Sequence, residues 1–344
     1  MELSPLFAWP AFALSAAVVV LAGTRLSHYG HRIAELSGLG GLWIGAVLMA
    51  AATSLPELFT DISAALLAAP DLAVGDLFGS SMVNMLVLGI IDLVHRQKRV
   101  WQQAALEHAL MAGLAVVLTA LAALFLSLES EIPLRVAELE CAFIALLYLL
   151  GMRIVYRQES ARRRQREMEK VVEAAEALTG EAPDRPAELL RAALGFATAA
   201  GVILVSAPIL ALSAREIAEA TGISTSFVGS SLLAVTTSLP ELVTALAAVR
   251  LGAFDLAVGN LFGSNAFNMA ALFAVDLAQR PGALLTSVAP VHAISALVAI
   301  LLMNIGIMGL LYRAEKRILL IEPDSALMIV GYALGMGLLF LAGG

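Results

Sequence analysis

Apolar residues recur along the chain in stretches long enough to cross a lipid bilayer. A helical span needs about 20 mainly apolar residues, and ten stretches meet this demand. They lie near residues 5–24, 40–67, 71–94, 104–126, 134–155, 191–212, 226–249, 255–278, 286–311 and 324–342. The first stretch follows no Lys or Arg and exceeds the length of a signal-peptide core, so it is interpreted as a span and not as a cleaved leader. The pattern predicts an all-α polytopic membrane protein with ten transmembrane helices.

The composition supports this prediction. Of the 344 residues, 60% are apolar and 14% are charged, and the mean hydropathy is +0.88. Soluble domains carry about 25% charged residues, so this chain has too few charges to cover a water-soluble surface. The apolar fraction argues against disorder, and the net charge of −7 argues against nucleic-acid binding. A single cysteine, Cys141, cannot form an internal disulfide.

The basic residues predict the orientation of the spans. With ten spans, 18 of the 21 Lys and Arg residues fall on one side of the membrane and three on the other. Because loops rich in Lys and Arg stay in the cytoplasm, both termini are expected outside. The polar segment 156–190 is then a cytoplasmic linker between two halves, 1–155 and 191–344. A solvated helix is the expected form of this linker, and a regulatory or anionic-lipid contact is the alternative.

The two halves contain an internal repeat. Residues 53–92 align without a gap to residues 237–276, at an offset of 184, and 23 of the 40 positions are identical. The chain is therefore a duplication. Five spans separate equivalent points, an odd number, so the copies cross the membrane in opposite directions. Inverted repeats of this kind are typical of transporters, with the binding site at the midplane between the copies.

Each copy places a carboxylate inside an apolar span, and each carboxylate directly follows a proline. Glu57 follows Pro56, and Glu241 follows Pro240. A carboxylate at the bilayer centre costs about 2.5–3.5 kcal/mol on insertion scales and needs a partner. Proline has no N–H and clashes with the carbonyl four residues earlier, so it frees backbone oxygens. The carbonyls freed in this way belong to Ala52 and Thr236.

Hydroxyl and amide side chains accompany each glutamate at helical spacing. They are Thr53, Ser54, Ser80 and Asn84 in the first copy, and Thr237, Ser238, Ser264 and Asn268 in the second. Carboxylates, hydroxyls, amides and freed carbonyls are hard oxygen ligands, which suit Ca²⁺, Na⁺ or Mg²⁺ and not zinc or copper. Ca²⁺ ranks above Mg²⁺ because it accepts six to eight oxygens in adaptable geometry. The glycines that precede Ser80 and Ser264 are interpreted as close packing positions.

At these residues the chain resembles the calcium/cation antiporter superfamily, specifically the Na⁺/Ca²⁺ exchanger branch. TSLPEL at 53–58 and 237–242, and GNLFGSNAFN at 259–268, are similar to the two repeat motifs of that family. The resemblance implies two inverted five-helix halves that exchange Ca²⁺ for Na⁺ by alternating access. It also implies that the glutamates and the hydroxyl and amide residues named above bind the ions. The expected partners are inorganic cations and the lipid bilayer, with no cofactor, no nucleic acid and no obligatory protein partner.

Departures from the family pattern affect the choice of ions. The first copy has Asp76 where Asn is usual and Asp61 where a small residue is usual. Two ionised glutamates match one Ca²⁺, two Na⁺ or two protons, whereas a third Na⁺ leaves a charge of +1 in a low-dielectric site. Asp61 or Asp76 joining the ion path is one interpretation. A helix-end acid that faces a water-filled entrance is the other.

Several functions remain as alternatives. The counter-ion is Na⁺ or H⁺, because crowded carboxylates also carry protons. An intramembrane enzyme is disfavoured, since the two glutamates have matched surroundings and the sequence has no Ser-His, Cys-His or HExxH arrangement. The five histidines have no motif around them and are interpreted as interfacial or packed. A passive cation channel is a distant alternative. The absence of an organelle-targeting signal favours a prokaryotic inner membrane.

Overall fold

The computed structural model describes residues 5–37, 49–94, 108–128, 139–173, 185–250, 253–279, 282–312 and 323–343. All regular elements in these ranges are helices. The first half contains α1 (Pro5–Ser37), α3 (Ala50–Thr53), α4 (Leu55–Leu66), α5 (Pro70–Val94), α7 (His108–Ser127) and α9 (Glu140–Glu173). The second half contains α10 (Arg185–Thr221), α11 (Thr225–Val228), the π-helix η3 (Gly229–Leu233), α12 (Ala234–Thr237), α13 (Leu239–Arg250), α14 (Phe254–Gln279), α15 (His292–Tyr312) and α16 (Pro323–Gly343).

Each of the ten expected spans corresponds to a helix or a broken helix. Among the described residues, seven helices are long and apolar enough to cross a membrane, and the bent pair of Thr225–Thr237 and Leu239–Arg250 makes an eighth. The other two expected spans, 40–67 and 134–155, begin in residues outside the described ranges. The chain is an integral membrane protein. Helix α9 continues without a break past the expected span end at 155 and reaches Glu173.

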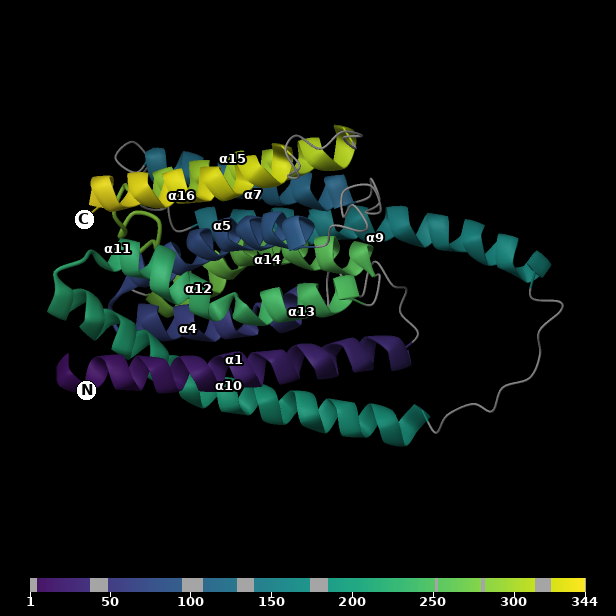
Figure 1. Ribbon diagram of the computed structural model, residues 1–344, viewed down its shortest axis with the longest axis horizontal. Helices are drawn as coiled ribbons and strands as arrows, with labels where there is room; N and C mark the ends of the chain where they lie inside the picture. Colours follow the sequence, from purple (N-terminus) through teal and green to yellow (C-terminus); the bar gives the residue numbers. More distant parts are fainter. Residues whose placement is uncertain are drawn as a thin grey trace.

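The two halves run in opposite directions. Helices α1 and α10 occupy equivalent places in the duplication and pack along each other over much of their length. Figure 1 shows them side by side and antiparallel, with the start of α1 near the end of α10. The inverted relation predicted from the odd number of intervening spans is therefore confirmed.

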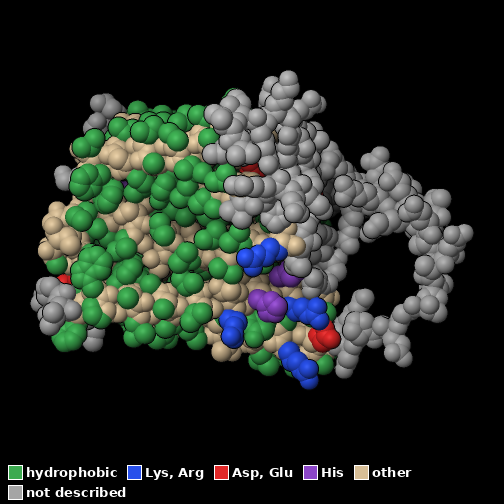
Figure 2. All heavy atoms as spheres, in the orientation of Figure 1, with side chains coloured by type: hydrophobic (Ala, Val, Ile, Leu, Met, Phe, Trp, Pro, Cys, Tyr) green, Lys and Arg blue, Asp and Glu red, His purple; other side chains and the backbone are tan. Residues whose placement is uncertain are grey.

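The ends of the molecule differ in character. The start of α1 and the end of α16 lie at one end of the molecule. The end of α9 and the start of α10 lie at the other end (Figure 1). Figure 2 shows apolar side chains over most of the visible face, with Lys and Arg gathered where α1 ends and α10 begins. An apolar belt that ends in a basic rim is the surface expected of a polytopic protein with basic loops on one side.

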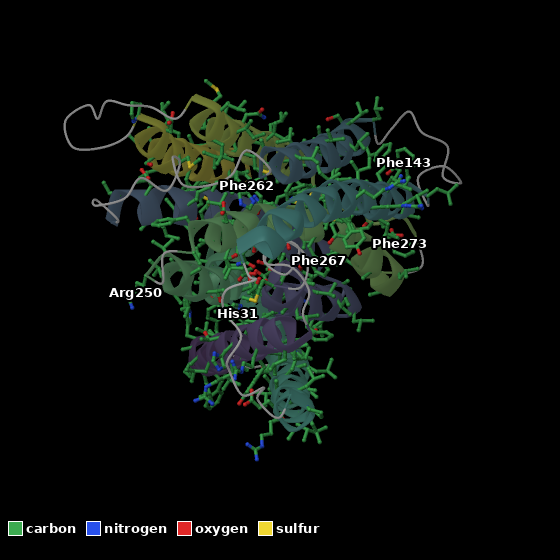
Figure 3. The ribbon with its side chains drawn as sticks, turned by 90° about the vertical axis from the view of Figure 1, so that its right-hand side faces the viewer. His31, Phe143, Arg250, Phe262, Phe267 and Phe273 are labelled. Atoms are coloured by element: carbon green, nitrogen blue, oxygen red, sulfur yellow. The ribbon has the colours of Figure 1, made fainter. Side chains whose placement is uncertain are left out.

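Helices α5 and α14 form the centre of the bundle, and close backbone contacts hold α5 in place. In the view along the bundle, Phe262 and Phe267 of α14 lie near the middle and Arg250 lies at the periphery (Figure 3). Gly79 of α5 packs against η3 so closely that a Cβ atom there would lie 2.6 Å from both Cα and the carbonyl oxygen of Ser230. The packing role expected for this glycine agrees with that geometry.

Two Asp–His pairs join the halves to each other. His292 Nε2 lies 3.0 Å from Asp71 Oδ1, and His108 Nε2 lies 3.2 Å from Asp255 Oδ1. Asp71 and Asp255 are 184 residues apart, and so are the two histidines. Both histidines are buried, as the interpretation of packed histidines expects. The duplication therefore extends beyond the 40-residue motif to contacts that link helices of opposite halves.

Candidate ion-binding site

The two motif helices break at equivalent serines. Helix α3 ends at Thr53 and α4 begins at Leu55, with Ser54 between them at φ −88° and ψ 5°. Helix α12 ends at Thr237 and α13 begins at Leu239, with Ser238 at φ −84° and ψ 1°. The segments on either side of Ser238 meet at a bend of 41°. Since Pro56 and Pro240 cannot donate a hydrogen bond within the helix, a break at these positions follows from the sequence.

Each break brings its serine to the glutamate of the opposite half. Ser54 Oγ donates to Glu241 Oε1 at 3.3 Å, and Ser238 Oγ donates to Glu57 Oε1 at 3.4 Å. The two bonds are related by the 184-residue offset. The glutamates are 1% and 0% exposed, so both carboxylates lie in the interior and neither faces lipid. Each of the two predicted acids therefore contacts the opposite half of the chain.

The threonines make a second crossed set of contacts. Thr53 Oγ1 donates to Asn260 Oδ1 at 3.3 Å and lies 3.3 Å from Ser264 Oγ. Its equivalent, Thr237, donates to Asp76 Oδ1 at 3.0 Å and lies 3.4 Å from Ser80 Oγ. Each hydroxyl of one half thus contacts the central helix of the other half. The result is a cluster of oxygen atoms with approximate twofold symmetry at the centre of the bundle.

The family follows from a comparison that covers most of the chain. The family described as "Sodium/calcium exchanger protein" matches residues 7–157 and 191–341, one match for each half. The chain belongs to this sodium/calcium exchanger family. The matched segments flank the linker and include every residue of the central cluster.

Individual relatives of the exchanger family agree with this assignment. The chain is 30% identical to the inner membrane protein YrbG of Escherichia coli (strain K12) over 77% of this chain and 78% of that protein. It is 28% identical to the putative antiporter CaxA of Alkalimonas amylolytica over 88% of this chain and 92% of that protein. A solved structure of the sodium-calcium exchanger NCX_Mj, soaked with 2.5 mM Na⁺ and 10 mM Sr²⁺, matches with a TM-score of 0.63 at 20% identity. This match covers 97% of this chain and 99% of that one and establishes the fold.

Several buried polar atoms of this exchanger-family cluster lack a hydrogen-bond partner in the described chain. They are Glu57 Oε2, Glu241 Oε2, Asn84 Oδ1, Asn260 Nδ2, and both Oδ1 and Nδ2 of Asn268. Leaving a buried polar group unpaired costs about 1–3 kcal/mol, and more for a charged group. Most of these atoms are oxygens that point to no donor, and such oxygens are suited to ligate a hard cation.

The remaining predicted residues near the cluster are Ala52, Thr236 and Asp61. Ala52 and Thr236, whose carbonyls were expected to be freed, are both buried, and the hydroxyl of Thr236 donates to Leu232 O of its own helix at 2.8 Å. Asp61 is 0% exposed. The interpretation of Asp61 as an acid facing a water-filled entrance is therefore wrong for this structure, because the side chain is enclosed where α4 packs against α5.

Two polar residues of the cluster were missed by the motif analysis. Asn260 accepts the hydrogen bond from Thr53, and Asn265 accepts from Asn84 Nδ2 at 2.9 Å and donates to Ser81 O at 3.3 Å. Alignment of the two copies at the 184-residue offset would have identified Asn260, because this residue is the equivalent of Asp76. The contact of Asn265 with Asn84 has no such signal, since the equivalent of Asn265 is Ser81, whose hydroxyl bonds to its own helix.

Proposed function

We propose that this protein is a membrane antiporter that exchanges Ca²⁺ for Na⁺ by alternating access. The ions bind between the two halves at the cluster around Glu57 and Glu241. Oxygen ligands come from Thr53, Ser54, Ser80 and Asn84 of the first half and from Thr237, Ser238, Ser264 and Asn268 of the second.

The observation that carries this proposal is the crossed hydrogen bonding of the two glutamates. Each carboxylate is held by a serine of the other half, so the site is shared between two inverted units. When one unit moves relative to the other, the geometry around the shared ion changes, as alternating access requires. The two carboxylates carry a charge of −2 when ionised, which one Ca²⁺ or two Na⁺ neutralises.

The orientation and location complete the proposal. The basic residues favour both termini outside and segment 156–190 in the cytoplasm. The start of α1 and the end of α16 lie at the end of the molecule opposite to the end of α9 and the start of α10, which supports placing the termini and the linker on opposite sides (Figure 1). A relative named as an inner membrane protein of Escherichia coli supports a prokaryotic inner membrane.

Flux measurements with separately imposed gradients test the function. Purified protein in proteoliposomes loaded with Na⁺ is expected to take up ⁴⁵Ca²⁺ when diluted into Na⁺-free medium, because outward Na⁺ movement drives the exchange. Uptake that is indifferent to the Na⁺ gradient would reject Na⁺ as the counter-ion. Protein-free liposomes with the same gradients are the control, and Ca²⁺ flux that needs no counter-ion would identify a channel.

A proton-coupled exchanger is the second candidate. It is favoured by the number of buried carboxylates, since Glu57 and Glu241 share the described core with Asp61 and Asp76. In this case an imposed pH gradient drives ⁴⁵Ca²⁺ uptake without Na⁺, and a pH-sensitive dye inside the vesicles records the proton movement. A dye signal that stays constant during Ca²⁺ flux contradicts proton coupling.

A further inference from the structure

The described core holds more carboxyl groups than one exchanged Ca²⁺ balances when all of them are ionised. Four of the buried carboxyl groups lie on the motif helices α4, α5 and α13: Glu57 at 1% exposure, and Asp61, Asp76 and Glu241 at 0%. Within the described ranges no Lys or Arg is buried, and both buried histidines pair with other acids. Buried charges without partners are expensive. One Ca²⁺ or two Na⁺ at the glutamates therefore leaves the two aspartates to be neutralised by another cation or by a proton.

Asp61 and Asp76 face each other across the contact between α4 and α5. Both side chains are fully buried where these two helices pack, and the two carboxyl groups interact with each other. Asp76 Oδ1 accepts from Thr237 Oγ1 at 3.0 Å and from Ser80 Oγ at 3.3 Å. Asp76 Oδ2 and both oxygens of Asp61 accept from no donor in the described chain. Three buried carboxyl oxygens of this pair therefore have no donor among the described residues.

The second half has no counterpart of this pair. The 184-residue offset relates Asp61 to Ala245 and Asp76 to Asn260. Asn260 keeps the contact with threonine, because its Oδ1 accepts from Thr53 as Asp76 accepts from Thr237. A carboxylate is therefore not needed to hold the threonine in place. The extra charge of the first half has no role in the symmetric framework of the glutamate site.

We propose that Asp61 and Asp76 form a separate cation position for Na⁺ in the first half, next to the glutamate site. A single positive charge relieves the repulsion of the pair, and oxygens of neighbouring groups complete the shell of a monovalent ion. The six to eight ligands of Ca²⁺ would require many more oxygens than the three free ones. Asp61 lies one turn beyond Glu57 on α4, towards the connection with α5. In the orientation proposed above, this side faces outward, so the position rests on the proposed function and extends it.

The second half of the chain supplies the substitutions that test this position. Asp61→Ala and Asp76→Asn give the first half the residues found at the equivalent places of the second. Binding of ⁴⁵Ca²⁺ to the purified protein is measured with increasing Na⁺ as competitor. Each variant is expected to need about tenfold more Na⁺ for half displacement, a loss of about 1.4 kcal/mol, with a Hill coefficient lower by about one. Ca²⁺ affinity without Na⁺ is expected to change less than about threefold, or about 0.7 kcal/mol.

Three results would overturn the proposal. Unchanged Na⁺ displacement in both variants means that the pair holds no Na⁺, and a pair that holds only a proton gives this result. An equal loss of Ca²⁺ and Na⁺ binding means that the aspartates belong to the glutamate site. Direct measurements of ²²Na⁺ binding give the third result. If the unmodified protein and both variants bind the same amount of ²²Na⁺, the proposal is wrong.

Controls separate these results from misfolding and from failure of the proposed function. Glu219→Gln removes an acid on α10 whose side chain is 53% exposed. This substitution should leave the binding of Ca²⁺ and of Na⁺ unchanged. Asp61→Asn keeps the side-chain shape if Asp61→Ala does not give a monodisperse protein. An unmodified protein that binds no Ca²⁺ contradicts the proposed function, and the aspartate pair is then judged from ²²Na⁺ binding alone.

Discussion

Glu57→Gln and Glu241→Gln are each expected to abolish Ca²⁺ transport while leaving a folded, membrane-inserted protein. Each substitution keeps the side-chain shape and removes one of the two charges that face the divalent ion. A loss of about 3 kcal/mol of binding energy corresponds to a reduction of more than about 100-fold in affinity. The crossed bonds from Ser238 and Ser54 can still form, because a glutamine carbonyl also accepts from a hydroxyl.

The measurement is ⁴⁵Ca²⁺ uptake into proteoliposomes, with size-exclusion chromatography to confirm folding. Glu219→Gln is the matched control, since it makes the same chemical change at an exposed position on α10. Normal transport by either glutamate variant would show that the site has been assigned to the wrong residues. Loss in one variant alone would contradict a site shared by the two halves.

Gly79→Leu is expected to prevent the two halves from docking. A Cβ atom at Gly79 would lie 2.6 Å from Cα and from the carbonyl oxygen of Ser230, and 2.8 Å from Ala234 Cβ. Two of these three atoms are backbone, so the clash cannot be relieved by rotating a side chain. Overpacking in well-packed cores costs about 1–3 kcal/mol or more. We expect a lower melting temperature in detergent and a large loss of monodisperse protein.

Gly113→Leu is the matched control for this prediction. Gly113 lies in the interior of α7, and apart from its chain neighbours and the backbone of its own helix no described atom lies within 4 Å of the position that its Cβ would take. Replacing it should leave the melting temperature unchanged or raise it slightly, because glycine disfavours a helix. A Gly79→Leu protein as stable as the Gly113→Leu protein would show that α5 and η3 are not held in close contact.

The parts of the fold that depend on one strong local signal could be predicted from the sequence. Hydrophobic length located the spans, and the doubled TSLPEL motif located both glutamates and both helix breaks. The breaks were predictable because the missing N–H of Pro56 and Pro240 acts within one helical turn. The inversion was predictable because an odd number of spans separates the copies.

Features that depend on contacts between distant helices were not predicted. The π-helix at Gly229–Leu233 has no distinctive residue pattern and packs closely against α5. The pairs His108–Asp255 and His292–Asp71 join residues 147 and 221 positions apart, so no local motif marks them. Enclosure of Asp61 depends on how α4 packs on α5, whereas its sequence position one turn beyond Glu57 is equally compatible with a solvated helix face.

The crossed serine–glutamate bonds constrain how such a protein can have arisen. A single half contains one glutamate and one serine of the motif, and the serine reaches only the glutamate of the opposite unit. An ancestor of half this length could have built the site only as a homodimer whose two copies were inserted in opposite orientations. The fused chain has no such requirement, because each half needs to insert in one direction only. The two copies within one chain are free to diverge. Asp61 and Asp76, which align with Ala245 and Asn260 of the second half, are examples of such divergence.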